Sequence, residues 1–141
     1  MEEKAFRTER VFAAAPERVW AAFADPSELA RWWGPKGFTN TFARFEFAPG
    51  GRWVFTMHGP NGVDYPNECV FRETGAGRIV IEHVVDPWFT LTVTLEAVDG
   101  GTRVVWVQDF ASAKVAAGVR AIVEPANEEN LDRLAGVLGV Q

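Results

Sequence analysis

The feature that most constrains the fold is a series of short apolar segments between residues 38 and 110. These segments read FTNTFARFEF, RWVFTMH, YPNECVFRE, RIVIEHVV, WFTLTVTLEAV and TRVVWVQDF, and they are separated by APGG, GPNG, TGAG, DP and DGG. β-Branched and aromatic residues between glycine- and proline-containing turns are typical of antiparallel strands joined by hairpins. A further strand is expected at residues 6–12. Together they predict an antiparallel sheet of about six to seven strands.

The last two strand segments give the most detailed prediction, because a two-residue turn at Asp99-Gly100 sets their register. Val98 then lies opposite Gly101, and three further pairs follow, namely Leu95 with Val104, Val93 with Trp106 and Leu91 with Gln108. One face of this hairpin is apolar. The other face carries threonines and charged residues at Thr90, Thr92, Thr94, Glu96, Arg103 and Asp109. The apolar face must be covered by a second layer.

The covering layer is predicted in residues 112–140. Apolar side chains recur there at helical spacing, at Val115, Val119, Ile122, Val123, Leu131, Leu134 and Leu138. Pro125 predicts a kink or a restart, because proline lacks the backbone N–H and its ring clashes with the preceding turn. Glu129 and Arg133 are expected to form an exposed i,i+4 ion pair.

Two shorter helices are predicted near the N-terminus, in APERVWAAFAD and PSELARWW. Pro26 separates them, since proline disfavours helix at the preceding Asp25. In the second helix Trp32 and Trp33 flank one stripe with Leu29, and Gly34-Pro35 ends the helix behind them. Two interpretations of the paired indoles stay open: core packing, or one ring buried while the other reaches the mouth of a pocket.

These elements predict a single α+β domain spanning residues 1–141. A curved antiparallel sheet wraps around the long C-terminal helix, and two short helices follow the first strand and close one end. A sheet that grips a helix in this way often leaves space that side chains do not fill. A cavity between the sheet and the helix is therefore expected.

Composition excludes several classes of partner. The chain carries 14 basic and 19 acidic residues, a net charge of −5, and no lysine or arginine cluster, which argues against a nucleic-acid partner. No segment approaches the roughly 18 apolar residues of a membrane span, and the N-terminal MEEKAFRTER lacks the apolar core of a secretory signal. A single cysteine, Cys69, excludes an internal disulfide and fits a cytoplasmic location.

Three stretches carry a family resemblance: VFAAAPERVWAAFADPSELARWWGP, APGGRWVFTMHGPNGVDYPNE and NLDRLAGVL. Over residues 6–140 the chain resembles the START-related, birch-pollen-allergen-like superfamily known as SRPBCC. Within it, the chain is similar to the subgroup named for homology to an activator of a heat-shock-protein ATPase. The resemblance implies a helix-grip fold around a hydrophobic pocket. It implies no single activity, because members of the superfamily include lipid carriers, enzymes and a co-chaperone.

The leading interpretation is a protein that binds a small apolar or amphipathic ligand between the sheet and the C-terminal helix. The predicted apolar wall consists of Trp20, Trp33, Trp53, Phe55, Trp106 and Val119. Two polar contacts are predicted, Glu68 and His83. His83 alternates in phase with Ile79 and Ile81, which predicts that it points inward, either to a ligand or to a single buried partner.

Two alternatives come from other classes. The first is a cyclase- or hydrolase-like enzyme that uses an inward acid or histidine. It requires two inward titratable groups within hydrogen-bond reach. The second is an interaction module that binds a chaperone ATPase or a second copy of the chain. It requires an exposed apolar patch, and it is favoured if Trp88 and one of the paired tryptophans are exposed together. No cofactor or metal is predicted, since two histidines and one cysteine show no metal-ligand spacing.

Overall fold

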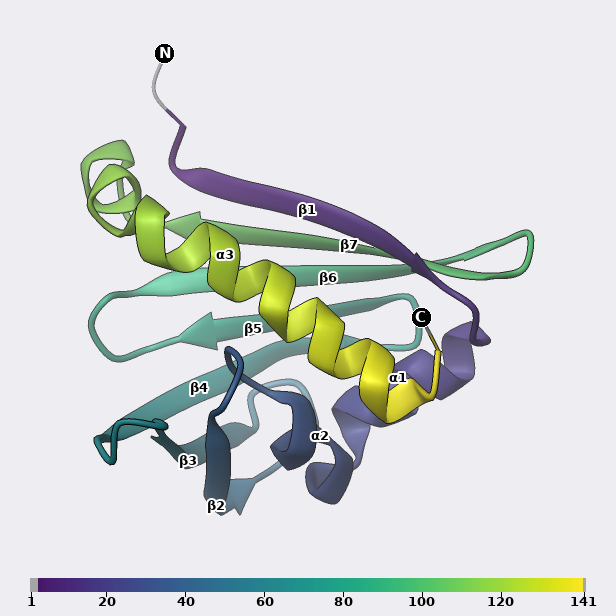
Figure 1. Cartoon of the computed structure of the whole chain (residues 1–141), viewed down its shortest axis with the longest axis horizontal. Helices are drawn as coiled ribbons and strands as arrows, with labels where there is room; N and C mark the ends of the chain where they lie inside the picture. The colour runs from purple at the N-terminus through teal and green to yellow at the C-terminus, as the bar shows by residue number, and fades with distance from the viewer. Residues whose placement is uncertain (1–2, 141) are drawn as a thin grey trace.

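A computed structural model describes residues 3–140, and in it the predicted strands form one seven-stranded antiparallel sheet (Figure 1). The strands are β1 (Ala5–Phe12), β2 (Thr39–Phe45), β3 (Arg52–His58), β4 (Asp64–Gly75), β5 (Arg78–His83), β6 (Phe89–Val98) and β7 (Gly101–Phe110). Their order in the sheet is β1-β7-β6-β5-β4-β3-β2. Strands β2 to β7 therefore form a meander, and β1 adds to its β7 edge. The expected α+β helix-grip architecture is confirmed.

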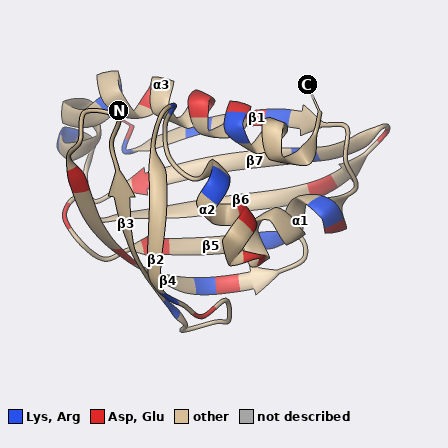
Figure 2. Cartoon of the chain, turned by 60° about the horizontal axis from the view of Figure 1, so that its bottom comes forward, with Lys and Arg blue, Asp and Glu red and all other residues tan. Residues whose placement is uncertain are grey.

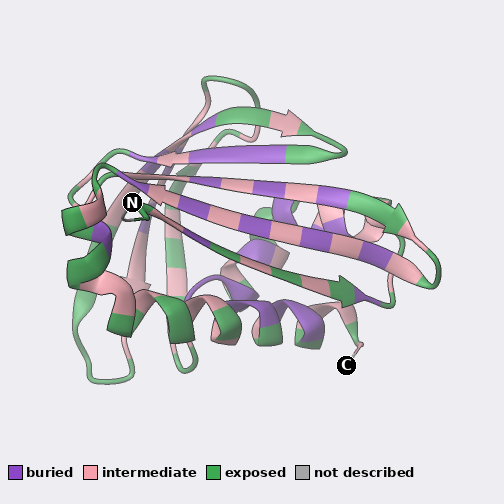
Figure 3. Ribbon diagram, turned by 90° about the horizontal axis from the view of Figure 1, so that it is seen from above, coloured by how far each residue is buried: buried purple, intermediate pink, exposed green. Residues whose placement is uncertain are grey.

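The hairpin of β6 and β7 has the register predicted from its turn. Val98 pairs with Gly101, Leu95 with Val104, Val93 with Trp106 and Leu91 with Gln108. Burial alternates strictly along β7, so its inward face is apolar apart from Thr102 and Gln108. Figure 3 shows this alternation of buried and less buried positions along the central strands.

Two short helices follow β1, as predicted. They are α1 (Pro16–Ala24) and α2 (Pro26–Trp32). Asp25 joins them: it ends α1, and its side chain accepts a hydrogen bond of 2.9 Å from the backbone N–H of Ser27, which caps α2. The indole of Trp32 donates to the carbonyl oxygen of Ala22 at 2.9 Å and ties the two helices together.

The long helix α3 (Ala113–Leu138) contains Pro125 and is continuous through it. Figures 1 and 3 show that its first turns run in a different direction from the remainder, so the helix bends rather than restarts. The missing N–H of Pro125 explains why a bend is tolerated there. The two parts pack separately. Leu131 and Leu134 join the main core, whereas Ala116 joins a smaller cluster with Phe6 and Phe110.

The expected ion pair between Glu129 and Arg133 is not formed within residues 3–140. The Arg133 guanidinium instead contacts the loop after α2. Its Nη1 lies 3.0 Å from each of the carbonyl oxygens of Trp33, Gly34 and Pro35, and its Nη2 lies 2.9 Å from that of Arg31 and 2.8 Å from that of Phe38. Carbonyl groups at the end of a helix lack intrahelical donors and carry partial negative charge, so a guanidinium group placed there is favourable.

Charged residues of both signs alternate over the surface (Figure 2). Many form pairs on the outer face of the sheet, among them Arg72 with Glu82 and Arg103 with Glu96. Within residues 3–140, none of the helices has the length and apolar character that a membrane crossing requires.

Candidate functional site

A cavity of about 220 Å³ lies between the inner face of the sheet and α3. Five strands, α3 and the loop after α2 contribute to its wall. The lining residues are Trp33, Gly34, Pro35, Phe55, Met57, Asn67, Cys69, His83, Phe89, Leu91, Trp106, Gln108, Ile122, Val123, Ala126, Asn127 and Asn130. The wall is mainly apolar and aromatic, with a small number of neutral polar groups, which is the usual character of a small-molecule site.

A wider outer hollow of about 580 Å³ adjoins this cavity. Both spaces are lined by Pro35, Met57, Asn67, His83 and Ile122, so these residues mark the passage between them. The outer hollow is further bounded by Phe38, Tyr65, Pro66 and Val85 and by two carboxylates, Asp64 and Asp86. Ile122 is 75% exposed although it contributes to the inner wall, which places the opening beside α3.

Four of the eight predicted contact residues line the cavity: Trp33, Phe55, His83 and Trp106. The rings of Trp33 and Trp106 lie 5.9 Å apart between their centroids. Phe55 and Trp106 lie on inward positions of β3 and β7, and His83 ends β5 on the same face. The strand alternation read from the sequence therefore places these side chains correctly.

The other four lie elsewhere. Trp53 is fully buried behind the wall, with its ring 5.0 Å from Trp33 and 4.1 Å from Phe55. Trp20 packs on Phe47 at the α1 end of the molecule and donates to the carbonyl oxygen of Thr74 at 3.2 Å. Val119 packs in the cluster of Phe6 and Phe110.

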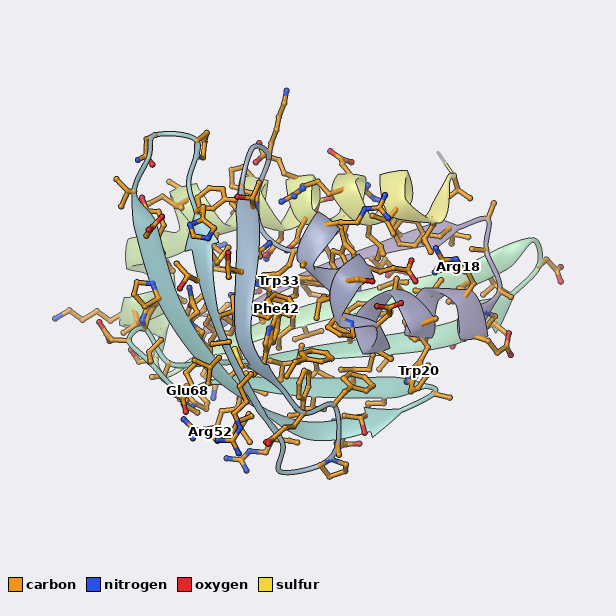
Figure 4. All side chains as sticks on the ribbon, turned by 90° about the horizontal axis from the view of Figure 1, so that it is seen from below. Arg18, Trp20, Trp33, Phe42, Arg52 and Glu68 are labelled. Carbon is orange, nitrogen blue, oxygen red and sulfur yellow. The ribbon has the colours of Figure 1, made fainter. Side chains whose placement is uncertain are left out.

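Glu68 points to the outer face of the sheet. Its neighbours Asn67 and Cys69 line the cavity, so the pleat of β4 turns Glu68 outward. There its carboxylate accepts a hydrogen bond of 3.0 Å from Nε of Arg52. Figure 4 shows Glu68 and Arg52 together at one edge of the molecule, away from Trp33.

The paired tryptophans are both buried in the main core cluster, and Trp33 in addition lines the cavity. Trp32 is fully buried between the short helices and the sheet. Trp33 follows the helix in an extended conformation, with φ −68° and ψ 134°, and its ring lines the cavity while remaining only 8% exposed. The break at Gly34-Pro35 thus lets one of two adjacent indoles reach the cavity while both stay in the core.

His83 lies at the passage between the cavity and the outer hollow. Its Nδ1 lies 2.8 Å from the carbonyl oxygen of Pro87, to which it donates, and its Nε2 lies 2.6 Å from Oδ1 of Asn67. Its ring stacks on Phe89, with 4.4 Å between the centroids. Burial lowers the pKa of His83, against the raising effects of the Pro87 hydrogen bond and the Asp86 charge. Both ring nitrogens face oxygen atoms, and a neutral imidazole can donate to only one of them, so these contacts favour the charged form while burial opposes it.

Lowering the pH from about 7 to about 5 is expected to destabilise the wild-type protein relative to His83→Gln. The unfolded chain protonates this histidine below about pH 6.5, whereas burial lowers its pKa in the folded state. The contribution of His83 to the free energy of unfolding is complete above pH ~6.5. It is lost as the pH falls toward the folded-state pKa, by at most about 1.4 kcal/mol per pH unit. Urea unfolding of both proteins across this range measures the difference. His58 is common to both, and parallel curves would contradict the assignment.

Sequence reasoning did not assign Gln108, Asn127 or Asn130. Gln108 could have been identified from the sequence, because strand alternation puts it in phase with Val104 and Trp106 on β7. It is therefore a polar residue on an apolar face. The two asparagines of α3 had none, since polar residues on a long helix are ordinary. Asn130 has a structural role: its Oδ1 accepts from the N–H of Gly34 at 3.3 Å, and its Nδ2 donates to the carbonyl oxygen of Trp32 at 3.0 Å.

The geometry that the enzyme interpretation requires is not found within residues 3–140. The titratable groups lining the inner cavity there are the His83 imidazole and the Cys69 thiol. Burial raises the pKa of Cys69, so the thiol stays protonated. The partners of His83 are an amide oxygen and a backbone carbonyl, and neither can transfer a proton near neutral pH.

The joint exposure of Trp88 and a paired tryptophan, which would favour the interaction-module interpretation, is not found in the described part of the chain. Trp88 is 39% exposed, and its indole donates to the carboxylate of Glu82 at 2.8 Å, but Trp32 and Trp33 are both buried. Binding of a chaperone ATPase and formation of a homodimer stay predictions of the sequence.

Comparisons with known proteins place the chain in a family. Residues 13–139 match the family model described as Activator of Hsp90 ATPase homolog 1-like protein. None of the curated proteins compared with the chain matches it.

Among solved structures, a protein from Arthrobacter aurescens is 27% identical, with a TM-score of 0.90 over 96% of this chain and 86% of that one. A protein from Rhodobacter sphaeroides is 26% identical, with a TM-score of 0.85 over 96% of this chain and 92% of that one. A protein from Mycobacterium smegmatis is also 26% identical, with a TM-score of 0.84 over 96% and 91%. The chain belongs to the family of Activator of Hsp90 ATPase homolog 1-like proteins.

Proposed function

We propose that this protein binds a small apolar or amphipathic molecule in the cavity between the sheet and α3. The observation that carries the proposal is the unfilled volume itself. Protein interiors are packed to the density of organic crystals, and voids larger than a few water molecules are rare. A space of about 220 Å³ walled by Trp33, Phe55, Leu91 and Trp106 is large for a chain of 141 residues.

The continuity of the inner cavity with the outer hollow supports the same proposal. A ligand needs a route of entry, and the outer hollow reaches the inner wall at Met57, Asn67 and Ile122. The outer hollow, bounded by apolar side chains and by Asp64 and Asp86, would accept the less buried end of an amphipathic molecule. We assign Trp33, Phe55 and Trp106 to the apolar contacts and His83 to a polar contact. A cytoplasmic location stays the prediction made from the cysteine content.

Replacing Ala126 by phenylalanine is expected to weaken binding of a neutral fluorescent probe with two fused rings, 2-methylnaphthalene, at least tenfold. Ala126 lines the cavity from α3, so a benzyl group added there would occupy space that the probe needs. A tenfold loss corresponds to about 1.4 kcal/mol. Fluorescence titration measures the affinity, and native mass spectrometry of the purified wild-type protein tests for a molecule that co-purifies.

Ala121→Phe is the matched control, because Ala121 is an exposed residue of the same helix. It should leave the affinity unchanged, and thermal unfolding should show that both variants are folded. Equal affinity of the wild-type protein and Ala126→Phe would show that the probe binds elsewhere. A wild-type protein that binds no probe and carries no co-purifying molecule would refute the proposed function.

A further inference from the structure

The most informative polar feature of the cavity is a pair of carboxamides that is only partly satisfied. Gln108 of β7 is 8% exposed and lines the cavity, and its Oε1 accepts a hydrogen bond of 3.0 Å from Nδ2 of Asn127 on α3. Within residues 3–140, neither Nε2 of Gln108 nor Oδ1 of Asn127 has a hydrogen-bond partner. The pair therefore offers one free NH₂ donor and one free carbonyl acceptor beside the same empty space.

Gln108 is more than nine-tenths buried, and its neighbours on the inward face of β7 are Trp106 and Phe110. Its Nε2 and the Oδ1 of Asn127 are not fully enclosed by protein atoms, so water reaches both through the cavity. A ligand that displaced this water without replacing its hydrogen bonds would leave both groups unsatisfied, which is costly. A ligand group that accepts from Gln108 and donates to Asn127 would satisfy both.

The charge of the wall limits the kind of group that fits. Within residues 3–140, the residues lining the inner cavity include no lysine, arginine, aspartate or glutamate. Burial lowers the pKa of His83, which disfavours its charged form. A carboxylate entering this space would lose its hydration without meeting a cation, which is strongly unfavourable. Asp64 and Asp86 in the outer hollow also repel anions.

The volume limits the size of the buried part. A dry cavity of about 150 Å³ accepts benzene, so the roughly 220 Å³ measured here accommodates one ring or two fused rings. The aromatic wall of Trp33, Phe55 and Trp106 favours a flat body, because rings pack well on rings.

We propose that the cavity selects uncharged molecules that combine a body of one or two rings with a terminal primary amide or hydroxyl group. Gln108 and Asn127 are the residues that recognise this terminal group, and they reject the corresponding carboxylate. The assignment rests on the proposed function and adds to it the chemical class of the ligand and the residues that determine specificity.

Three probes of nearly equal size test the assignment: 2-naphthamide, 2-naphthoate and 2-methylnaphthalene. The wild-type protein is expected to bind the amide at least tenfold more tightly than the carboxylate or the hydrocarbon. Gln108→Leu keeps the approximate size of the side chain and removes its hydrogen bonds. It should weaken amide binding about tenfold and leave hydrocarbon binding unchanged or tighter. Thr94→Val, on the opposite face of β6, is the matched control and should change none of the three affinities.

Four outcomes would count against the assignment, and they differ in what they imply. Equal affinity for the amide and the carboxylate would overturn selection for neutral ligands, and the proposed function would stand. Equal affinity for the amide and the hydrocarbon in the wild-type protein would overturn recognition of the terminal group. If Gln108→Leu weakened all three probes equally, it would overturn the role of Gln108 in recognition. If the wild-type protein bound none of the probes, both this inference and the proposed function would fail.

Discussion

Replacing Trp53 by alanine is expected to lower the free energy of unfolding by about 3–5 kcal/mol, the range for truncation of a buried aromatic side chain. Trp53 is fully buried in β3. Its ring lies 4.1 Å from that of Phe55, 5.0 Å from that of Trp33 and 5.4 Å from that of Phe42, measured between centroids. Alanine would leave a void behind the cavity wall that these rings cannot fill without moving. Equilibrium urea denaturation measures the loss.

Two further variants show whether lost packing is the cause. The indole nitrogen of Trp53 is buried and has no acceptor within residues 3–140. Trp53→Phe therefore removes an unsatisfied donor and keeps a ring, and it should cost less than half of the alanine loss. Trp88→Ala removes an indole that is 39% exposed and should cost about 1 kcal/mol or less. Similar losses for Trp53→Ala and Trp88→Ala would contradict this account of the core.

Replacing Arg133 by methionine is expected to lower the free energy of unfolding by about 2–4 kcal/mol. The guanidinium contacts five backbone carbonyl oxygens at the end of α2 and in the loop that follows. A hydrogen bond to a charged group contributes about 1.5–3 kcal/mol. The expected loss is smaller than the sum over five such hydrogen bonds, because some of the released carbonyl groups form hydrogen bonds to water instead. Urea denaturation measures the change.

The same variant tests how the cavity wall is held. Trp33, Gly34 and Pro35 line the cavity and are positioned by Arg133 from α3. Probe affinity should therefore fall together with stability. Arg133→Lys keeps the charge without the planar fork and should show an intermediate loss. Arg7→Met, at an exposed ion pair with Glu9, should change stability by less than about 0.5 kcal/mol. A loss at Arg7 equal to that at Arg133 would contradict the proposed role.

The candidate site shows how far strand alternation can be followed in a sequence. Alternation placed His83 and Trp106 on the inward face, and both line the cavity. Glu68 shows where this reasoning stops. A β-bulge between Phe71 and Glu73 shifts the register of β4 against β5, so the facing of β4 cannot be counted from its turns alone. A shift of one residue exchanges the inward and outward sets.

Helical residues were harder to place. Val119 and Ala126 both lie on α3, yet Val119 packs against the cluster of Phe6 and Phe110 and Ala126 lines the cavity. The bend of α3 and its rotation about its own axis decide which residues face the open space. Neither is set by the spacing of apolar residues. Arg133 is a similar case, because its local i,i+4 partner was evident in the sequence and its five carbonyl partners were not.

The sequence by itself determined the elements of this protein and their local geometry: the hairpin register at Asp99-Gly100 and the ends of the two short helices. These depend on backbone periods and turn conformations, which act over a few residues. Only the tertiary structure decided that Gln108 meets Asn127, that Arg133 holds the loop after α2, and that a cavity of about 220 Å³ stays open. Those features depend on how the bent helix settles on the curved sheet, which is fixed by packing among residues far apart in the chain.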